Sequence, residues 1–277
     1  MRGGVAVDPV LRISIGNGCV RALWPLRVII HKFGPMSGEA VKIRLYLEQP
    51  LGAGQGLDLS RDHAHYLFNV MRLGPGAAVA VFNGRDGAWL AKVAEAGKRG
   101  GTLLCQHQIA PQRDPPDLWL IFAPIKKART DFIVEKAAEL GAARILPVQT
   151  EFTNSDRIRQ DRLQAHATEA AEQCGGTFVP VVEDLQPLSR LLANWPEGRA
   201  LIWADEGLAD TAAPAPMPPA PAALLIGPEG GFSPSERDRL RALPMVHPIS
   251  LGPRILRADT AAVAAMTLWQ SAAGDWA

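Results

Sequence analysis

Cysteine is scarce in this sequence of 277 residues. The three cysteines, Cys19, Cys105 and Cys174, lie far apart and form no C-x-x-C pair. This spacing argues against a disulfide framework or a zinc site, and it fits a reducing cytoplasm. Long apolar runs are lacking as well, because none approaches the roughly 20 residues needed to cross a bilayer. We therefore expect a cytoplasmic protein with no metal and no membrane partner.

Net charge is also almost absent, at +1, but its distribution is uneven. Residues 1–113 hold 14 Lys+Arg against 7 Asp+Glu, whereas the remainder holds 15 against 21. A basic first half indicates a nucleic-acid surface there, although surface cations without a partner are common. The hydrophobic fraction of 47% and the charged fraction of 21% are typical of a globular chain.

The first 35 residues differ in composition from the rest of the chain. They carry five basic residues and one acid, and their apolar patch at 23–30 is broken by Pro25. This segment could function as a targeting peptide or as an RNA-binding arm. No small-residue cleavage site follows the patch, which argues against a signal peptide. The sequence from Met36 onwards resembles a natural protein start, so we expect residues 1–40 to be a disordered N-terminal extension.

Residues 41–113 predict short elements. Strands are expected at 43–47, 78–82, 89–93 and 102–106, with a helix at 62–73 that ends at a Gly-Pro-Gly turn. Together they predict a small barrel-like β domain. The proline-rich segment 111–116 cannot continue a strand, so we place the domain boundary there.

From residue 117 onwards, strands and helices alternate. We expect strands at 118–122, 144–148, 179–182, 200–203, 224–226 and 247–249, and helices at 130–140 and 157–174. This alternation is typical of a parallel sheet with helices on both faces. The Pro/Ala-rich stretch 210–221 reads as an inserted loop at the edge of the site.

Two glycine-rich turns follow the last two strands. The first is Gly-Pro-Glu-Gly-Gly at 227–231, after which Ser233, Pro234 and Glu236 have the spacing of a helix N-cap with a capping box. The second is Leu-Gly-Pro-Arg-Ile-Leu-Arg at 251–257, before a last helix that begins near Asp259. Glycines let a backbone approach a ligand closely. The pair therefore predicts one ligand with an adenine edge, a ribose and a charged tail. A nucleotide-binding oxidoreductase is disfavoured, since no G-x-G-x-x-G follows an early strand.

This ordered pair of turns resembles the RsmE family of the SPOUT superfamily. The resemblance implies a 16S rRNA (uracil-N3)-methyltransferase that uses S-adenosyl-L-methionine and modifies the uracil-1498 position of the small ribosomal subunit. It also implies a homodimer, and an α/β fold with a trefoil-knotted SPOUT domain at 117–277 and a PUA-like β-barrel domain at 41–113. The alternatives are a knotted 2′-O-ribose methyltransferase and a non-catalytic RNA-binding dimer.

The resemblance and the turns together nominate binding residues. The cofactor site is expected to be built from three stretches that follow strands, 203–206, 226–231 and 250–256. The individual contacts expected there are Trp203, Ile226, Gly227, Pro228, Glu229, Gly230, Gly231, Ser250, Leu251, Gly252, Ile255 and Leu256. The expected RNA contacts are His65 and Arg72, on one helix face, and Lys126, Lys127 and Arg129, which precede a helix.

Methylation of uridine N3 requires that the N3 proton leave. Cationic donors that stabilise charge on O2 and O4, or a general base, would help this step. We assign the first role to Arg254 or Arg257 and the second, or an orienting role, to Glu229 or Asp259, while the arginines could instead pair structurally with carboxylates. The family's last motif has Thr-Glu where this chain has Ala258-Asp259, and its arginine after Gly175 is replaced here by Gly176. The first departure puts any role of Asp259 in doubt, and the second means that the role of the missing arginine is filled otherwise or not at all.

Overall fold

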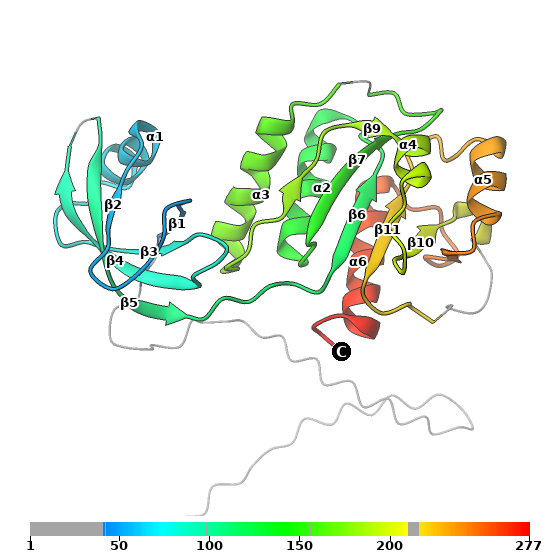
Figure 1. Cartoon of the computed structure of the whole chain (residues 1–277). Coiled ribbons are helices and arrows are strands. Elements are labelled where there is room, and N and C mark those ends of the chain that lie inside the picture. Colours follow the sequence, from blue (N-terminus) through cyan, green and yellow to red (C-terminus); the bar gives the residue numbers. More distant parts are fainter. Residues whose placement is uncertain (1–40, 42, 98, 156, 210–215) are drawn as a thin grey trace, which may run out of the picture. The chain divides into compact units, whose positions relative to one another are not determined.

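The computed structural model describes residues 41, 43–97, 99–155, 157–209 and 216–277 (Figure 1). The expected N-terminal extension and residues 210–215 of the Pro/Ala-rich loop lie outside these ranges. The described elements form a five-stranded sheet within 44–110 and a seven-stranded sheet within 118–249. None of the described helices is both long and apolar enough to span a membrane.

The first sheet confirms a β-rich N-terminal domain. Its strand order is β1-β3-β4-β5-β2, with β1 parallel to β3 and the other neighbours antiparallel. Inward-facing apolar side chains such as Leu45, Val81 and Leu103 form its core. The strands are β1 (Arg44–Tyr46), β2 (Gly56–Asp58), β3 (Ala78–Phe82), β4 (Ala88–Ala96) and β5 (Gly101–Ala110). The short β2 was not predicted.

The prediction of one helix over 62–73 is wrong in the type of helix and in the residue at which it ends. A short α-helix, α1 (Arg61–Ala64), runs into a π-helical turn, η1 (His65–Val70). Arg72 lies beyond the helix in the left-handed region, with φ at 55°. The wider π turn changes the angular spacing of side chains, so His65 and Arg72 do not share a helix face. His65 Nδ1 instead lies 2.9 Å from Asn69 Nδ2.

The second sheet is parallel at every pairing between its described strands. Its order is β12-β10-β11-β6-β7-β8, and β9 pairs with β7. All five residues of β11 are buried, as expected for a strand covered on both faces. The strands are β6 (Leu118–Phe122), β7 (Arg144–Gln149), β8 (Val181–Val182), β9 (Gln186–Pro187), β10 (Ala200–Ala204), β11 (Ala222–Ile226) and β12 (Val246–Ile249).

Helices cover both faces of this sheet, as predicted (Figure 1). Because side chains alternate along a strand, Leu120 of β6 packs in the core that includes α2, α3 and α6, whereas Ile121 packs in the core that includes α4 and α5. The helices are α2 (Lys127–Glu139), α3 (Gln160–Cys174), α4 (Leu188–Ala193), α5 (Pro234–Arg241) and α6 (Ala258–Ala273), with a 3-10 turn, η2 (Glu206–Leu208).

Several boundaries differ from the predictions. Helix α2 begins at Lys127, three residues earlier than expected, α3 begins at Gln160, three residues later, and β8 is reduced to two residues. The capping box of α5 is confirmed: Ser233 Oγ accepts from the Glu236 N–H, and Glu236 Oε2 accepts from the Ser233 N–H. The parallel α/β fold with a β-rich first domain is thus confirmed, and the trefoil knot stays a prediction.

Candidate functional site

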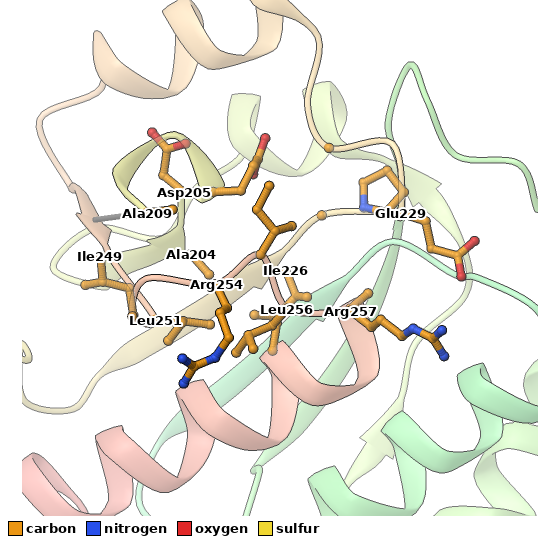
Figure 2. Close-up of a pocket in the computed structure, with 18 residues that line it drawn as sticks. Ala204, Asp205, Ala209, Ile226, Glu229, Ile249, Leu251, Arg254, Leu256 and Arg257 are labelled. Carbon is orange, nitrogen blue, oxygen red and sulfur yellow. The ribbon is translucent and has the colours of Figure 1, made fainter. Parts of the chain in front are cut away.

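A cavity of about 230 Å³ opens where β10, β11 and β12 end. These three strands are neighbours in the parallel sheet, so their carboxyl ends share one edge, where open α/β sheets bind ligands. Asp205 follows β10, Glu229 follows β11 and Arg254 follows β12, and all three border the cavity (Figure 2). The lining residues are Ala204, Asp205, Glu206, Ala209, Ile226, Gly227, Pro228, Glu229, Gly231, Ile249, Leu251, Gly252, Arg254, Ile255, Leu256, Arg257, Ala258 and Ala261.

The loop after β11 needs its glycines for two reasons. Gly231 has φ at 70°, in the left-handed region that other residues avoid, and its N–H donates to Pro228 O at 2.9 Å. A Cβ at Gly227 would stand 2.7 Å from the ring of Phe232. A side chain at residue 227 would therefore disturb the packing of this buried phenylalanine as well as the cavity wall.

The loop after β12 bends at Gly252. Its φ is 103°, its N–H donates to Ser250 Oγ at 3.3 Å, and a Cβ there would have no protein atom within 4 Å. Beyond it, Ile255 is 78% exposed, whereas Leu256 packs against the apolar core that includes α6. The two glycine turns therefore border one cavity.

The stretch 203–206 at the end of β10 was predicted as part of the site, but its tryptophan does not line the cavity and its acids do. Trp203 is fully buried, stacks edge-on against Phe232 and does not line the cavity. The next three residues, Ala204, Asp205 and Glu206, do line it. Trp203 instead packs in the core that includes α4 and α5.

Arg129 lies between two of the predicted catalytic acids. Its Nη1 is 3.5 Å from Glu229 Oε1, and its Nε is 3.9 Å from Asp259 Oδ2. Arg129 was predicted to bind RNA phosphate from a segment ahead of a helix. Because α2 begins earlier than expected, this arginine sits in the first turn of α2 and pairs with carboxylates from the loop after β11 and from α6.

The remaining predicted residues lie in several places. Glu229, Arg254 and Arg257 line the cavity, whereas Asp259 lies in the first turn of α6 outside the lining. Gly230 and Ser250 are also outside it, although both belong to the two turns. Lys126 and Lys127 are exposed at the start of α2, and His65 and Arg72 belong to the first domain. Within the described residues, no cluster of three or more His, Cys, Asp or Glu side chains could hold a metal ion.

The composition of the lining defines what it can hold. Ile226, Ile249, Leu251 and Leu256 give an apolar surface, while the two turns expose backbone N–H and C=O groups beside it. Asp205 and Glu206 follow β10, Glu229 follows β11, and Arg254 and Arg257 follow β12. A concave, mainly apolar site with a few convergent polar groups is typical of a small-molecule or cofactor site.

Comparisons with known proteins agree with this geometry. Residues 112–270 match the model of an RNA methyltransferase domain, and residues 59–104 match that of an RNA methyltransferase PUA domain. The ribosomal RNA small subunit methyltransferase E of a Synechocystis strain is 31% identical over 222 residues, covering 75% of this chain and 70% of the relative. The protein of the same name from Rickettsia conorii is 28% identical over 228 residues, covering 80% and 93%.

A solved structure is similar over the same region. The ribosomal RNA small subunit methyltransferase E from Neisseria gonorrhoeae, bound to S-adenosyl methionine, superposes with a TM-score of 0.76 at 28% identity and covers 85% of this chain and 99% of that one. The RNA methyltransferase domain model includes every residue that lines the cavity, and the PUA domain model matches part of the first sheet. The chain therefore belongs to the ribosomal RNA small subunit methyltransferase E family of RNA methyltransferases, as the two glycine turns predicted.

Proposed function

We propose that this protein transfers a methyl group from S-adenosyl-L-methionine to N3 of a uridine in 16S rRNA of the small ribosomal subunit. The observation that carries the proposal is the single cavity bordered by both glycine turns. The family membership supports the reaction class, and the bound ligand of the Neisseria gonorrhoeae relative supports the cofactor. We place the activity in residues 117–277 and RNA recognition in residues 41–113.

The residues of the cavity fit this cofactor. Ile226, Leu251 and Leu256 offer an apolar surface for the adenine, and the backbone around Gly231 and Gly252 can approach polar edges because no side chain intervenes. Acidic side chains suit a ligand that carries a sulfonium and an ammonium group. When bound, S-adenosylmethionine supplies an electrophilic methyl group.

The exposed arginines suit the charge that develops on the base. Loss of the N3 proton places negative charge on the uracil oxygens O2 and O4, and guanidinium donors at the mouth of a cavity stabilise such charge. Arg254 and Arg257 both line the cavity and both are exposed. We assign them to the uracil oxygens. The target base must leave any stack to reach this position.

Glu229 is the better placed of the two candidate acids. It lines the cavity, whereas Asp259 does not, and Arg129 lies within 4 Å of both carboxylates. We assign Glu229 to accept or orient the N3 proton. Arg129, which also lies near Asp259, then orients the Glu229 side chain, so we assign Arg129 to positioning rather than to phosphate binding.

RNA contacts outside the cavity are assigned to exposed cations. Lys126 and Lys127 stand at the N-terminus of α2, where backbone N–H groups and lysines can meet a phosphate together. His65 and Arg72 on the first domain would contact the RNA further away. We propose a cytoplasmic homodimer, which sedimentation of the purified protein would test.

The proposal is tested by methylation of natural substrate. Purified protein is incubated with labelled S-adenosylmethionine and small ribosomal subunits that lack the modification, and the labelled nucleoside is isolated and its position mapped. We expect N3-methyluridine at a single site of 16S rRNA. A 2′-O-methylated nucleoside would favour the related knotted enzymes, and absence of label despite cofactor binding would favour a non-catalytic RNA-binding protein.

A further inference from the structure

Two arginines of α5 share two neighbours, Asp205 and Trp203, although Arg237 is 19% exposed and Arg241 is 52% exposed. Arg237 Nη2 is 2.6 Å from Asp205 Oδ1, and Arg241 Nη2 is 3.2 Å from Asp205 Oδ2. Their guanidinium carbons lie 5.7 and 5.8 Å from the centre of the Trp203 ring. Of the two, only Arg237 also forms an ion pair with Glu206 in the described part of the chain, with Nη1 at 2.5 Å from Oε1.

Asp205 anchors this arrangement. Its side chain is 1% exposed, and a buried carboxylate is stable only when it is paired and hydrogen-bonded. Oδ1 accepts from Arg237 and from the Gly207 N–H at 2.9 Å, while Oδ2 faces Arg241. Asp205 therefore fixes the guanidinium of Arg237. If Arg237 is removed, Asp205 still keeps Arg241 and the Gly207 N–H.

Glu206 has a different position, because it lines the cavity with its side chain 35% exposed. A carboxylate has about four acceptor sites, and the hydrogen bond from Arg237 uses one of them. A free glutamate side chain would lose rotamer freedom on meeting a ligand. Arg237 already restricts it, so the carboxylate is held on the wall before a ligand arrives.

The glycine turn after β11 is fitted to the same carboxylate. A Cβ at Gly231 would stand 2.6 Å from Glu206 Oε1, closer than non-bonded atoms approach. A side chain at residue 231 would therefore displace Glu206 or be excluded by it. The turn after β10, the turn after β11 and helix α5 thus meet at this one carboxylate.

From these contacts we propose that Glu206 is a cofactor-binding residue that accepts a hydrogen bond from a donor group of S-adenosylmethionine, and that Arg237 is the positioning residue that holds Glu206 in place. The donor is a ribose hydroxyl or the ammonium group of the methionine moiety. The inference rests on the proposed function, since it requires this cofactor in the cavity.

Calorimetric titration of the full-length protein with S-adenosylmethionine tests the inference. We expect Glu206→Ala to weaken binding by roughly ten- to a hundredfold, as loss of a charged hydrogen bond does, and Arg237→Met by about tenfold. Arg241→Met is the matched control: it removes a guanidinium from the same aspartate and the same tryptophan but not from Glu206. It should lower the melting temperature while the dissociation constant stays within about twofold.

A double variant separates positioning from simple structural damage. Once Glu206 is alanine, Arg237→Met should weaken binding by less than about twofold more, because the residue that it positions is gone. Equal losses for Arg237→Met and Arg241→Met, or full additivity in the double variant, would overturn the role of Arg237. If Arg237→Met does not fold, Arg237→Lys serves instead, since one ammonium cannot reproduce the fork that meets both acids.

A second ligand identifies the donor. 5′-Methylthioadenosine has the ribose hydroxyls but no ammonium group, so an equal loss for both ligands in Glu206→Ala assigns a hydroxyl, and a loss for S-adenosylmethionine alone assigns the ammonium. Unchanged affinity of Glu206→Ala for both ligands would refute the inference and leave the proposed function standing. Failure of the wild-type protein to bind S-adenosylmethionine would overturn both.

Discussion

The charged side chains at two parts of the cavity differ in their pairing and exposure. At the acidic wall, Asp205 and Glu206 are held by arginines of α5, and Asp205 is buried. At the basic rim, Arg254 and Arg257 lie on the loop after β12 with exposed side chains. Paired and buried charge fixes the shape of a site, whereas exposed charge stays available to a substrate. On this basis we propose that the acidic wall binds the cofactor and that the basic rim recognises the uracil.

Arg129 differs from both groups, because it is near carboxylates and is also partly exposed. It lies within 4 Å of Glu229 and Asp259 but keeps 31% of its side chain exposed. Exposed ion pairs of this kind contribute at most about 1 kcal/mol to stability. We therefore propose that Arg129 orients the neighbouring acids and contributes little to the stability of the fold.

The largest effect on the cavity is expected from Gly252→Val. A φ of 103° strains any residue with a side chain, and the added atoms would project where no protein atom lies within 4 Å. We expect S-adenosylmethionine binding to become undetectable by calorimetry. Gly54→Val is the matched control, because Gly54 has φ at 76° and equally open surroundings but belongs to the first domain. Equal loss of binding in both variants would mean that strain, not the cavity, explains the effect.

The acidic wall is expected to matter for stability. Asp205→Asn removes the carboxylate that Arg237 and Arg241 share, while Arg237 keeps Glu206 and Arg241 is 52% exposed. We expect a loss of roughly 1.5–3 kcal/mol of unfolding free energy, as for hydrogen bonds to charged groups. Chemical denaturation followed by tryptophan fluorescence measures this loss. A variant as stable as the wild-type protein would show that ion pairs do not stabilise the acidic wall. It would contradict the proposed difference between the wall and the rim.

The basic rim is expected to matter for turnover. Replacement of Arg254 or Arg257 by methionine should lower the single-turnover rate by about a hundredfold for at least one of the two, the usual effect of removing a donor that stabilises developing charge. Affinity for S-adenosylmethionine should change far less than the rate. Full activity in both variants would exclude the rim from the chemical step.

The smallest effects are expected on the salt dependence of RNA binding, when single cations at the start of α2 are replaced. Lys126→Gln and Lys127→Gln should each lower the slope of log affinity against log salt for RNA binding by roughly 0.7, the value for one phosphate contact on a single strand. Arg129→Gln should leave the slope nearly unchanged, because its guanidinium is near two carboxylates. An equal drop in slope for Arg129→Gln would show that Arg129 binds a phosphate, as the sequence analysis predicted.

The parts of the fold that were predicted correctly depend on local signals. The capping box at Ser233 and the apolar strand β11 each follow from a few neighbouring residues. Strands β2 and β9 were missed because they have three and two residues and are defined by their pairing partners rather than by periodicity. The π turn at 65–70 was missed because apolar spacing does not distinguish it from an α-helix.

The same distinction holds at the site. Both glycine turns were located from the sequence because backbone demands select glycine. The pairing of Arg129 with Glu229 and Asp259 joins residues that lie far apart in the sequence, which no local pattern encodes. The network of Asp205, Glu206 and Arg237 was missed for the same reason, since it depends on how α5 packs beside β10.

The central claim is that the turns at 227–231 and 250–257 bind one molecule of S-adenosylmethionine together. Amide hydrogen exchange of the full-length protein, with and without S-adenosylmethionine, measures this most directly. We predict that both turns gain protection at the same ligand concentration, while the first domain is unchanged. Protection of only one turn, or of neither, would contradict the shared site.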